Sequence, residues 1–191
     1  MHRRARIAAL VASTVAALSG TVVAAGSAHA DYSIPSGPIR IVNYGSGKCV
    51  EPAPEIGTGN FFVNGLPIWQ RTCDGAPQQR WHLEPAGYGP VGRYGNFPRY
   101  HIVDEYSGQC LDLRDGRTND GAPLQQWSCN GSSTTMMWAV FDDFDGGSRQ
   151  LVNARSAVCA DVQWGSLQDY AYLQNYHCTD GNTAQHFFLN P

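Results

Sequence analysis

Residues 108–138 read GQCLDLRDGRTNDGAPLQQWSCNGSSTTMMW, and this stretch decides the fold because the chain repeats it. Residues 157–187, AVCADVQWGSLQDYAYLQNYHCTDGNTAQHF, carry the same features in register at a period of 49 residues. Residues 47–81 carry a longer third copy. Each copy has a cysteine followed two residues later by an acid, then a second cysteine and a closing aromatic residue. A regular period of this length is typical of a protein built from repeated structural units, so we predict three units.

The spacing within the copies supports this alignment. The two cysteines of successive units are 24, 19 and 19 positions apart, and the closing aromatic follows the second cysteine by 8, 9 and 9 positions. The first unit carries a five-residue insertion near residues 57–65. An excess of eight residues lies in the Gly-, Pro- and Tyr-rich stretch 88–99 before the second unit. We predict both insertions to be loops.

The repeat also predicts how the six cysteines pair. An even count in an exported protein indicates disulfides, and six cysteines allow fifteen pairings in principle. One pair in each unit selects a single set: Cys49–Cys73, Cys110–Cys129 and Cys159–Cys178. Each would close a loop of about twenty residues, which in the chain-entropy model stabilises the fold by roughly 3 kcal/mol. The chain has no Cys-x-x-Cys motif, so we expect neither a zinc site nor any other metal.

The strands predicted around these cysteines define an all-β fold. Short β-branched runs precede the first cysteine of each unit at residues 39–43, 100–104 and 149–153. With the cysteine strand, the strand before the second cysteine and the closing aromatic strand, each unit has four. Twelve strands with threefold pseudosymmetry favour a closed barrel, because closure removes sheet edges. The closing aromatics then occupy equivalent core positions: Trp81, Trp138 and Phe187.

The first thirty residues have the pattern of a signal peptide. Three arginines lead into an uncharged run at residues 7–25, and Ala28-His29-Ala30 forms a small-x-small cleavage site. A membrane anchor is the alternative, but Ala, Ser, Thr and Gly dilute the run. We therefore expect a signal peptide at 1–30 and a single domain at 31–191. The approximate repeats are residues 36–87, 98–146 and 147–191.

Charge further limits the function classes. Removing the three arginines of residues 1–30 leaves ten basic and sixteen acidic residues, a net charge of −6. Nucleic acids and anionic membranes require a basic face, so we expect neither as a partner. After residue 30 no apolar run is long enough for membrane insertion. We expect a secreted, extracellular monomer.

The three motifs together resemble those of the ricin B-type lectins, also called family 13 carbohydrate-binding modules. The motifs are Gly-x-Cys-x-Asp as in 108–112, Gln-x-aromatic-x-Cys as in 125–129, and a Gln-x-Trp closing motif, present here as 79–81. The resemblance covers residues 36–191 and implies a β-trefoil that binds galactose- or xylose-type glycans. It implies a freestanding secreted lectin, and the scarcity of lysine (Lys48 alone) suits a bacterial source.

The resemblance also implies one shallow sugar pocket per unit. The aspartate accepts hydrogen bonds from sugar hydroxyls, as a carboxylate can from two neighbouring donors. The aromatic ring packs on the apolar face of the sugar, and glutamines hold the aspartate and further hydroxyls. The implied carbohydrate-binding residues are Asp112, Gln125 and Trp127 in the second unit, and Asp161, Gln174, Tyr176 and Gln185 in the third.

Each unit departs somewhere from the family pattern. In the second, Thr135 and Met136 replace the closing Asn-Gln pair, and Asn130 or nearby serines could orient Asp112 in its place. In the third, Ala184 replaces the closing Asn. The first unit departs most, with Glu51 followed by Pro52 and with Trp69 and Arg71 at the glutamine and aromatic positions. The second and third units are therefore the expected sugar sites.

Other interpretations of these residues stay open. Asp112 and Asp161 could cap turns through their side chains, and Trp127 and Tyr176 could pack between units. Trp164 could extend the third pocket or anchor its loop. A β-trefoil that binds a protein, as an inhibitor or toxin-associated subunit does, could use the Tyr-rich stretch 88–106 as its contact surface. The sequence contains no hydrolase or nucleotide-binding motif, so we expect no enzyme, no catalytic residue and no cofactor.

Overall fold

A computed structural model describes residues 34–142 and 147–191 of the chain. The expected signal peptide lies outside these residues. Within them the chain forms twelve β-strands and six short 3₁₀ turns, without an α-helix, which confirms the all-β prediction. Among the described residues there is no helix with the length and apolar character needed to span a bilayer.

The twelve strands fall into three sets of four. The first set is β1 (Arg40–Asn43), β2 (Cys49–Pro52), β3 (Ile68–Arg71) and β4 (Trp81–Pro90). The second is β5 (Asn96–Asp104), β6 (Cys110–Leu113), β7 (Ala122–Trp127) and β8 (Met137–Asp142). The third is β9 (Arg149–Asn153), β10 (Cys159–Val162), β11 (Ala171–Tyr176) and β12 (Phe187–Asn190). The turns are η1 (Pro77–Gln79), η2 (Gly92–Tyr94), η3 (Arg114–Gly116), η4 (Thr134–Met136), η5 (Gln163–Gly165) and η6 (Thr183–Gln185).

Six strands close into a barrel. The antiparallel pairs run β1–β12, β12–β9, β9–β8, β8–β5 and β5–β4. A bridge between Ile39 and Trp81 joins the start of β1 to the start of β4 and completes the ring. Each unit supplies its first and fourth strand to this ring. This is the barrel of a β-trefoil, and it leaves none of its six strands unpaired at an edge.

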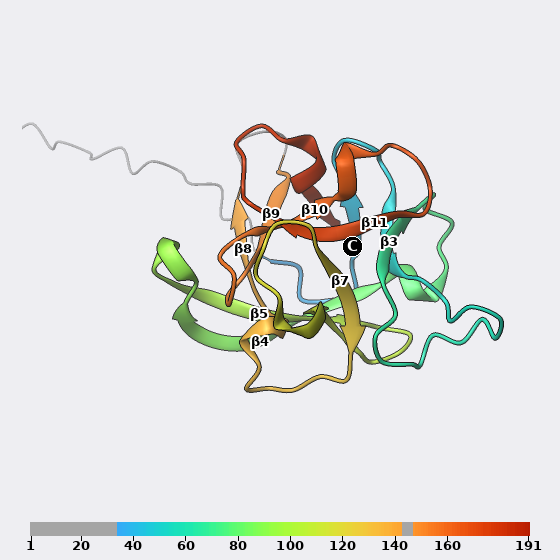
Figure 1. The fold of residues 1–191 in the computed structure, drawn as a ribbon, viewed down its shortest axis with the longest axis horizontal. Coiled ribbons are helices and arrows are strands. Elements are labelled where there is room, and N and C mark those ends of the chain that lie inside the picture. Colours follow the sequence, from blue (N-terminus) through green and yellow to red (C-terminus); the bar gives the residue numbers. More distant parts are fainter. Residues whose placement is uncertain (1–33, 143–146) are drawn as a thin grey trace, which may run out of the picture. The chain divides into compact units, whose positions relative to one another are not determined.

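The other six strands form three hairpins that cover one end of the barrel. They are β2–β3, β6–β7 and β10–β11. The second strands of these hairpins meet near the pseudo-threefold axis, where β11 pairs with both β3 and β7 and a bridge joins Pro67 to Gln125. Figure 1 shows β7, β11 and β3 side by side at this position. The residues expected to bind sugar lie on these hairpins or beside them.

The closing aromatics occupy the core as predicted. Trp81, Trp138 and Phe187 are fully buried within one cluster of Ile, Leu and Val side chains from all three units. Each tryptophan donates its indole N–H to a backbone carbonyl of its own unit: Trp81 to Val50 at 2.9 Å and Trp138 to Leu111 at 3.0 Å. The buried polar end of each ring is thus satisfied, as burial requires.

The three predicted disulfides are confirmed. Cys49–Cys73, Cys110–Cys129 and Cys159–Cys178 each join the first residue of a cap strand to the loop after its partner strand. The Cα–Cα distances are 5.0, 5.1 and 5.1 Å, within the range that disulfide geometry allows. One covalent closure therefore holds each cap hairpin.

The two insertions differ in structure. No strand forms within residues 57–65, which confirms the predicted loop. The prediction of a loop over 88–99 is wrong, because β4 and β5 pair from Trp81–Asp104 to Pro90–Asn96 with a bulge between Pro85 and Tyr88. Figure 1 shows these two strands running together (green). The hairpin is held down by apolar contacts, since Val91 is fully buried and packs with residues of β8 and β9.

Side chains lock each unit to the next in a cycle. A side-chain oxygen of one unit accepts a hydrogen bond from a backbone N–H of another unit. The donor is in each case the residue just before the second cysteine of its unit. The three bonds are Ser128 N to Asn64 Oδ1 at 2.8 Å, His177 N to Asp120 Oδ1 at 2.7 Å and Thr72 N to Asp169 Oδ1 at 2.8 Å. These acceptors stand nine positions before the second cysteine of their own units, so the first unit holds the second, the second holds the third and the third holds the first.

Candidate functional site

A shallow polar hollow of about 410 Å³ lies on the second unit. Asp112 on β6 faces Gln125 on β7 in the register of this hairpin. Trp127 lies two residues beyond Gln125 and so shares its face of the strand. All three residues line the hollow, as Asp115, Ser128, Asn130, Ser133, Thr135 and Met136 also do. The structure therefore brings together the three residues predicted in this unit.

The carboxylate of Asp112 is held at one oxygen only. Gln125 donates from Nε2 to Asp112 Oδ2 at 2.8 Å, while Oδ1 is buried and has no hydrogen-bond partner among the described residues. Asn130 does not orient Asp112, because its Oδ1 accepts from Ser132. The nearby Ser133 pairs with Thr135 at 2.7 Å instead. The prediction that these residues substitute for the missing closing pair is therefore wrong.

Met136 explains the unpaired oxygen. In the first unit the equivalent Gln79 accepts the backbone N–H of Asp74 through Oε1 and donates through Nε2 to the unit's carboxylate, Glu51, at 2.8 Å. Met136 keeps the first role, since its Sδ accepts the backbone N–H of Asn130 at 3.4 Å. A thioether has no proton to donate. The second role is lost, and Asp112 Oδ1 keeps an open acceptor.

Met136→Gln is expected to stabilise the fold by about 1–2 kcal/mol, because a buried carboxylate oxygen gains a donor. The gain is measured as the free energy of unfolding in denaturant titrations with the disulfides intact. Met137→Gln is the matched control, since Met137 is as buried as Met136 but belongs to a different apolar cluster. It is expected to destabilise the protein. Equal losses in both variants would show that residue 136 does not reach Asp112.

The third unit holds its carboxylate more completely. Asp161 on β10 faces Gln174 on β11, and Gln174 donates from Nε2 to Asp161 Oδ1 at 2.8 Å. Burial raises the pKa of Asp161, and hydrogen bonds from Gln174 and Gln185 act in the opposite direction. Tyr176, two residues after Gln174, is half-buried. Gln174 and Gln185 therefore lie beside the carboxylate of Asp161, and Tyr176 follows Gln174 on the same face of β11.

Asn182 is a site residue that the sequence analysis missed. Its Nδ2 lies 3.5 Å from Asp161 Oδ2, and its Oδ1 accepts the backbone N–H of Ala184 at the start of η6. It therefore supplies an amide beside Asp161 where the closing motif has Ala184 instead of Asn. Its position two residues before Ala184, in a turn-forming Gly-Asn-Thr run, was the available signal.

The first unit uses its carboxylate internally. Glu51 Oε1 accepts from Trp69 Nε1 at 3.0 Å and from Arg71 Nε at 2.8 Å. Oε2 accepts from Gln79. Both oxygens of Glu51 are thus engaged by side chains of the same unit. The charge on Glu51 also raises the pKa of Arg71 through its hydrogen bond and ion pair.

The two exposed tryptophans differ in how much of each side chain faces solvent. Trp127 is 42% exposed, so it faces solvent over much of its surface beside the second hollow. Trp164 is 89% exposed and therefore does not anchor its loop. Its backbone has a φ of 58°, a left-handed conformation that is unusual for a bulky residue and is associated with functional sites.

A β-trefoil whose units each present a carboxylate braced by a glutamine is the architecture of a lectin-like domain. Residues 21–127 and 91–176 match a family model described as ricin-type β-trefoil lectin domain-like. These two matches together span well over half of the sequence. The chain therefore belongs to this ricin-type β-trefoil lectin family.

Solved structures show the same fold. The designed threefold-symmetric protein ThreeFoil superimposes with a TM-score of 0.68 at 25% identity, covering 81% of this chain and 98% of that one. An exo-β-1,3-galactanase from Clostridium thermocellum gives 0.69 at 26% identity, covering 83% of this chain but 31% of the galactanase. A ricin B-like lectin from Macrolepiota procera, in complex with lactose, gives 0.60 at 13% identity, covering 81% of this chain and 95% of the lectin.

Proposed function

We propose that this protein is a secreted, non-catalytic lectin that binds galactose- or xylose-type glycans in the pockets of the second and third units. One observation carries the proposal: the carboxylate of Asp112, braced by Gln125, lines a shallow hollow beside the exposed ring of Trp127. A carboxylate in this place can accept hydrogen bonds from the hydroxyls of a sugar that enters the hollow.

The pocket chemistry suits a saccharide. Gln125 holds one oxygen of Asp112, so the carboxylate has a fixed orientation toward a pair of adjacent hydroxyls. Trp127 supplies a rigid apolar surface for the C–H face of a pyranose. In the third unit Gln174 holds Asp161 in the same way, and Tyr176 stands at the strand position of Trp127. Shallow, hydrated pockets bind weakly, and two of them on one molecule raise the avidity for a repeating glycan.

Galactose is the first sugar to test. One of the similar structures is an exo-β-1,3-galactanase, and the Macrolepiota lectin is in complex with lactose, which contains galactose. For this chain the likeness supports only the choice of probe.

We further propose that residues 1–30 are a signal peptide and that 31–191 form the mature monomeric domain. Three disulfides agree with an extracellular location.

A glycan array tests the proposal directly. The oxidised protein is expected to bind a set of galactose- or xylose-containing glycans and to be displaced by the free sugar. The double variant Asp112→Ala plus Asp161→Ala is expected to bind with an affinity reduced by a factor of about ten or more, because each site loses charge-assisted hydrogen bonds. Asp180→Ala, which removes an exposed carboxylate, is the matched control and should bind as the wild type does.

The outcome also separates the second candidate function, a β-trefoil that binds a protein. The long hairpin of β4 and β5 favours this candidate, since it presents Tyr88 with 70% exposure. A protein partner would stay bound in the presence of free monosaccharide. A folded wild type that binds no glycan of the array would contradict the lectin proposal for those glycans and favour this alternative.

A further inference from the structure

Three aromatic side chains gather where the first and third units meet. The rings of Trp69 and Tyr172 are nearly parallel, at an angle of 30° with centroids 6.3 Å apart. Tyr170 meets Trp69 edge-on, with centroids 4.9 Å apart. Both tyrosines are about half exposed. We call Trp69, Tyr170 and Tyr172 the aromatic platform; it lies outside the set of residues predicted to bind sugar.

Tyr172 is a common wall of three hollows. One of about 590 Å³ lies between Tyr172, Trp69 and the inserted loop of the first unit, including Ile56. A second of about 300 Å³ is lined by Trp164, Asp169 and both tyrosines. A third of about 240 Å³ lies where Tyr172 meets Pro67 and Pro123, its counterparts in the other units. The platform is therefore accessible from several directions.

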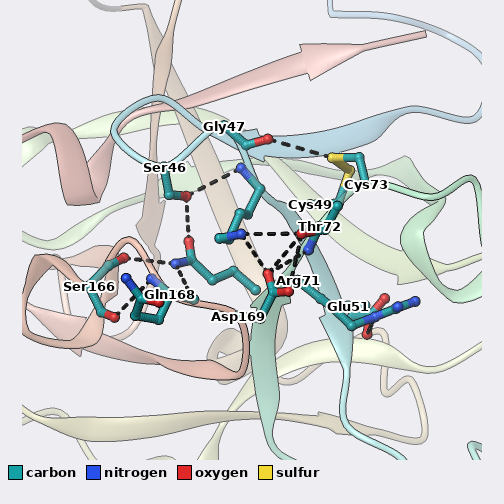
Figure 2. A network of polar contacts seen from close by, with 12 residues as sticks. Ser46, Gly47, Cys49, Glu51, Arg71, Thr72, Cys73, Ser166, Gln168 and Asp169 are labelled. Carbon is teal, nitrogen blue, oxygen red and sulfur yellow. Dashed lines mark hydrogen bonds and ion pairs between the residues drawn. A yellow bond between two sulfur atoms is a disulfide. The ribbon is translucent and has the colours of Figure 1, made fainter.

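A polar network fixes the loop that carries Tyr170. The amide of Gln70, on β3, donates to the carbonyls of Ser166 and Gln168 at 2.8 and 3.0 Å, and Asp169 pairs with Lys48 and accepts the backbone N–H of Thr72. Figure 2 shows Ser166, Gln168, Asp169 and Thr72 at this junction. The backbone N–H of Tyr170 donates to the Gln70 carbonyl at 2.7 Å. These bonds hold the third unit's loop against the first unit before any ligand arrives.

The first unit's carboxylate orients the remaining ring. Glu51 occupies the position of Asp112 and Asp161, yet it accepts the indole N–H of Trp69 at 3.0 Å. In the two proposed sugar sites the carboxylate faces a sugar hydroxyl, whereas in the first unit it holds the ring of Trp69. Pre-organised rings lose little conformational entropy on binding. The first unit thus contributes a stacking surface in place of a hydroxyl-binding pocket.

The hollow beside the platform begins two residues after Asp161 in the chain, and this position indicates the ligand. Gln163 and Trp164 follow Asp161 by two and three residues and line the hollow that reaches Tyr170 and Tyr172. A saccharide chain seated at Asp161 would pass the exposed ring of Trp164 toward the platform. Flat aromatic faces suit the apolar faces of pyranose rings. Glu55 lines the hollow beside Trp69, and the charge of Asp169 is balanced by Lys48, so these surroundings favour a neutral glycan.

We propose that the aromatic platform, with Trp164, is an additional binding surface for the internal residues of a neutral polysaccharide whose other residues occupy the third pocket. The inference rests on the proposed function. The affinity then depends on the length of the saccharide. A disaccharide contacts a pocket alone, whereas a longer oligosaccharide contacts the third pocket and the aromatic platform.

Calorimetric titration with β-1,3-galacto-oligosaccharides and xylo-oligosaccharides of two and six residues tests this. Tyr172→Ala is expected to weaken hexasaccharide binding about tenfold and to leave disaccharide binding unchanged, and Trp164→Ala is expected to weaken hexasaccharide binding by a similar factor. Tyr172→Phe keeps the ring and should bind as the wild type does. Tyr88→Ala removes a tyrosine of similar exposure from the distant β4–β5 hairpin and should change neither affinity. Unaltered denaturation curves establish that each variant folds.

The outcomes separate the two proposals. If the wild type binds disaccharides but the hexasaccharide affinity is insensitive to Tyr172→Ala and Trp164→Ala, the platform is overturned and the proposed lectin function stands. If Tyr88→Ala weakens binding as much as Tyr172→Ala, the effect is not local and the platform is again overturned. If the wild type binds neither the disaccharide nor the hexasaccharide of either series, the proposed lectin function and the proposed platform are both contradicted.

Discussion

Asp104→Asn is expected to raise the free energy of unfolding by about 3 kcal/mol at pH 8. Asp104 is fully buried, and its Oδ1 has no hydrogen-bond partner among the described residues. Burial raises the pKa of its carboxyl to about 6, against hydrogen bonds from Ser107 that act to lower it. At pH 8 the folded protein must keep this carboxylate ionised in the interior. A difference of about two pKa units from the usual value corresponds to about 3 kcal/mol.

The pseudosymmetry shows why asparagine fits this position. Asn43 and Asn153 are the equivalents of Asp104, each six residues before the first cysteine of its unit. Asn43 donates from Nδ2 to the carbonyls of Thr183 and Ala184 at 3.1 and 3.2 Å, and Asn153 donates to Thr135 at 2.8 Å. The matching carbonyls for residue 104 lie in η1. An ionised aspartate has no proton to give them, whereas an asparagine does.

The pH dependence gives the sign of the effect. Because the folded-state pKa lies above the unfolded-state value, the wild type loses stability relative to Asp104→Asn as the pH rises from about 4 through 6, and the difference is then constant. Below pH 4 both proteins are neutral at this position and should be nearly equal. Denaturant titrations from pH 3.5 to 8 measure this. A difference that stays the same across the range, or one also shown by the exposed control Asp180→Asn, would contradict the assignment to Asp104.

Trp138→Ala is expected to cost about 3–5 kcal/mol, the range for removing a large aromatic side chain from a packed core. Trp138 is fully buried and touches apolar residues from all three units. The ring also satisfies the carbonyl of Leu111. The loss is measured as the free energy of unfolding followed by far-ultraviolet circular dichroism. The intact disulfides are expected to keep the variant folded at low temperature.

A graded series separates packing from hydrogen bonding at this position. Trp138→Phe keeps most of the ring but leaves the Leu111 carbonyl without its donor, which we expect to cost about 1–3 kcal/mol. Phe187, the equivalent residue of the third unit, fills its position without an indole N–H. If Trp138→Phe were as costly as Trp138→Ala, the polar contact and not the packing would dominate. If it were without cost, the bond to Leu111 would contribute nothing.

Repetition is what made the fold predictable. Three copies in register predicted the disulfide pairs and the buried positions of Trp81, Trp138 and Phe187, because equivalent residues must have equivalent environments. The β4–β5 hairpin has no counterpart in the other units, so this argument could not reach it. Its Gly and Pro residues indicated a loop, while the contacts of Val91 with β8 and β9, which are distant in sequence, decide that it is a hairpin.

Side-chain chemistry at the candidate site was predictable only in part. The family resemblance implied that glutamines hold Asp112 and Asp161, and the register of the two hairpins places Gln125 and Gln174 opposite them. The sequence did not indicate that Met136 keeps the acceptor role of a glutamine, because a sulfur acceptor leaves no pattern in sequence. The acceptors Asn64, Asp120 and Asp169 were visible as a repeated polar position, but their partners lie in neighbouring units.

The cycle of bonds that these three acceptors form fixes the cyclic order of the units but not the unit at which the chain begins. Each unit recognises the next through the same side-chain oxygen, and β1 pairs with β12, so that Arg40 lies opposite Asn190 at the two ends of the domain. A chain with these ends linked and with a new opening between β8 and β9 keeps every one of these bonds. A circular permutation therefore preserves the cycle of three bonds, whereas the deletion of one unit breaks it.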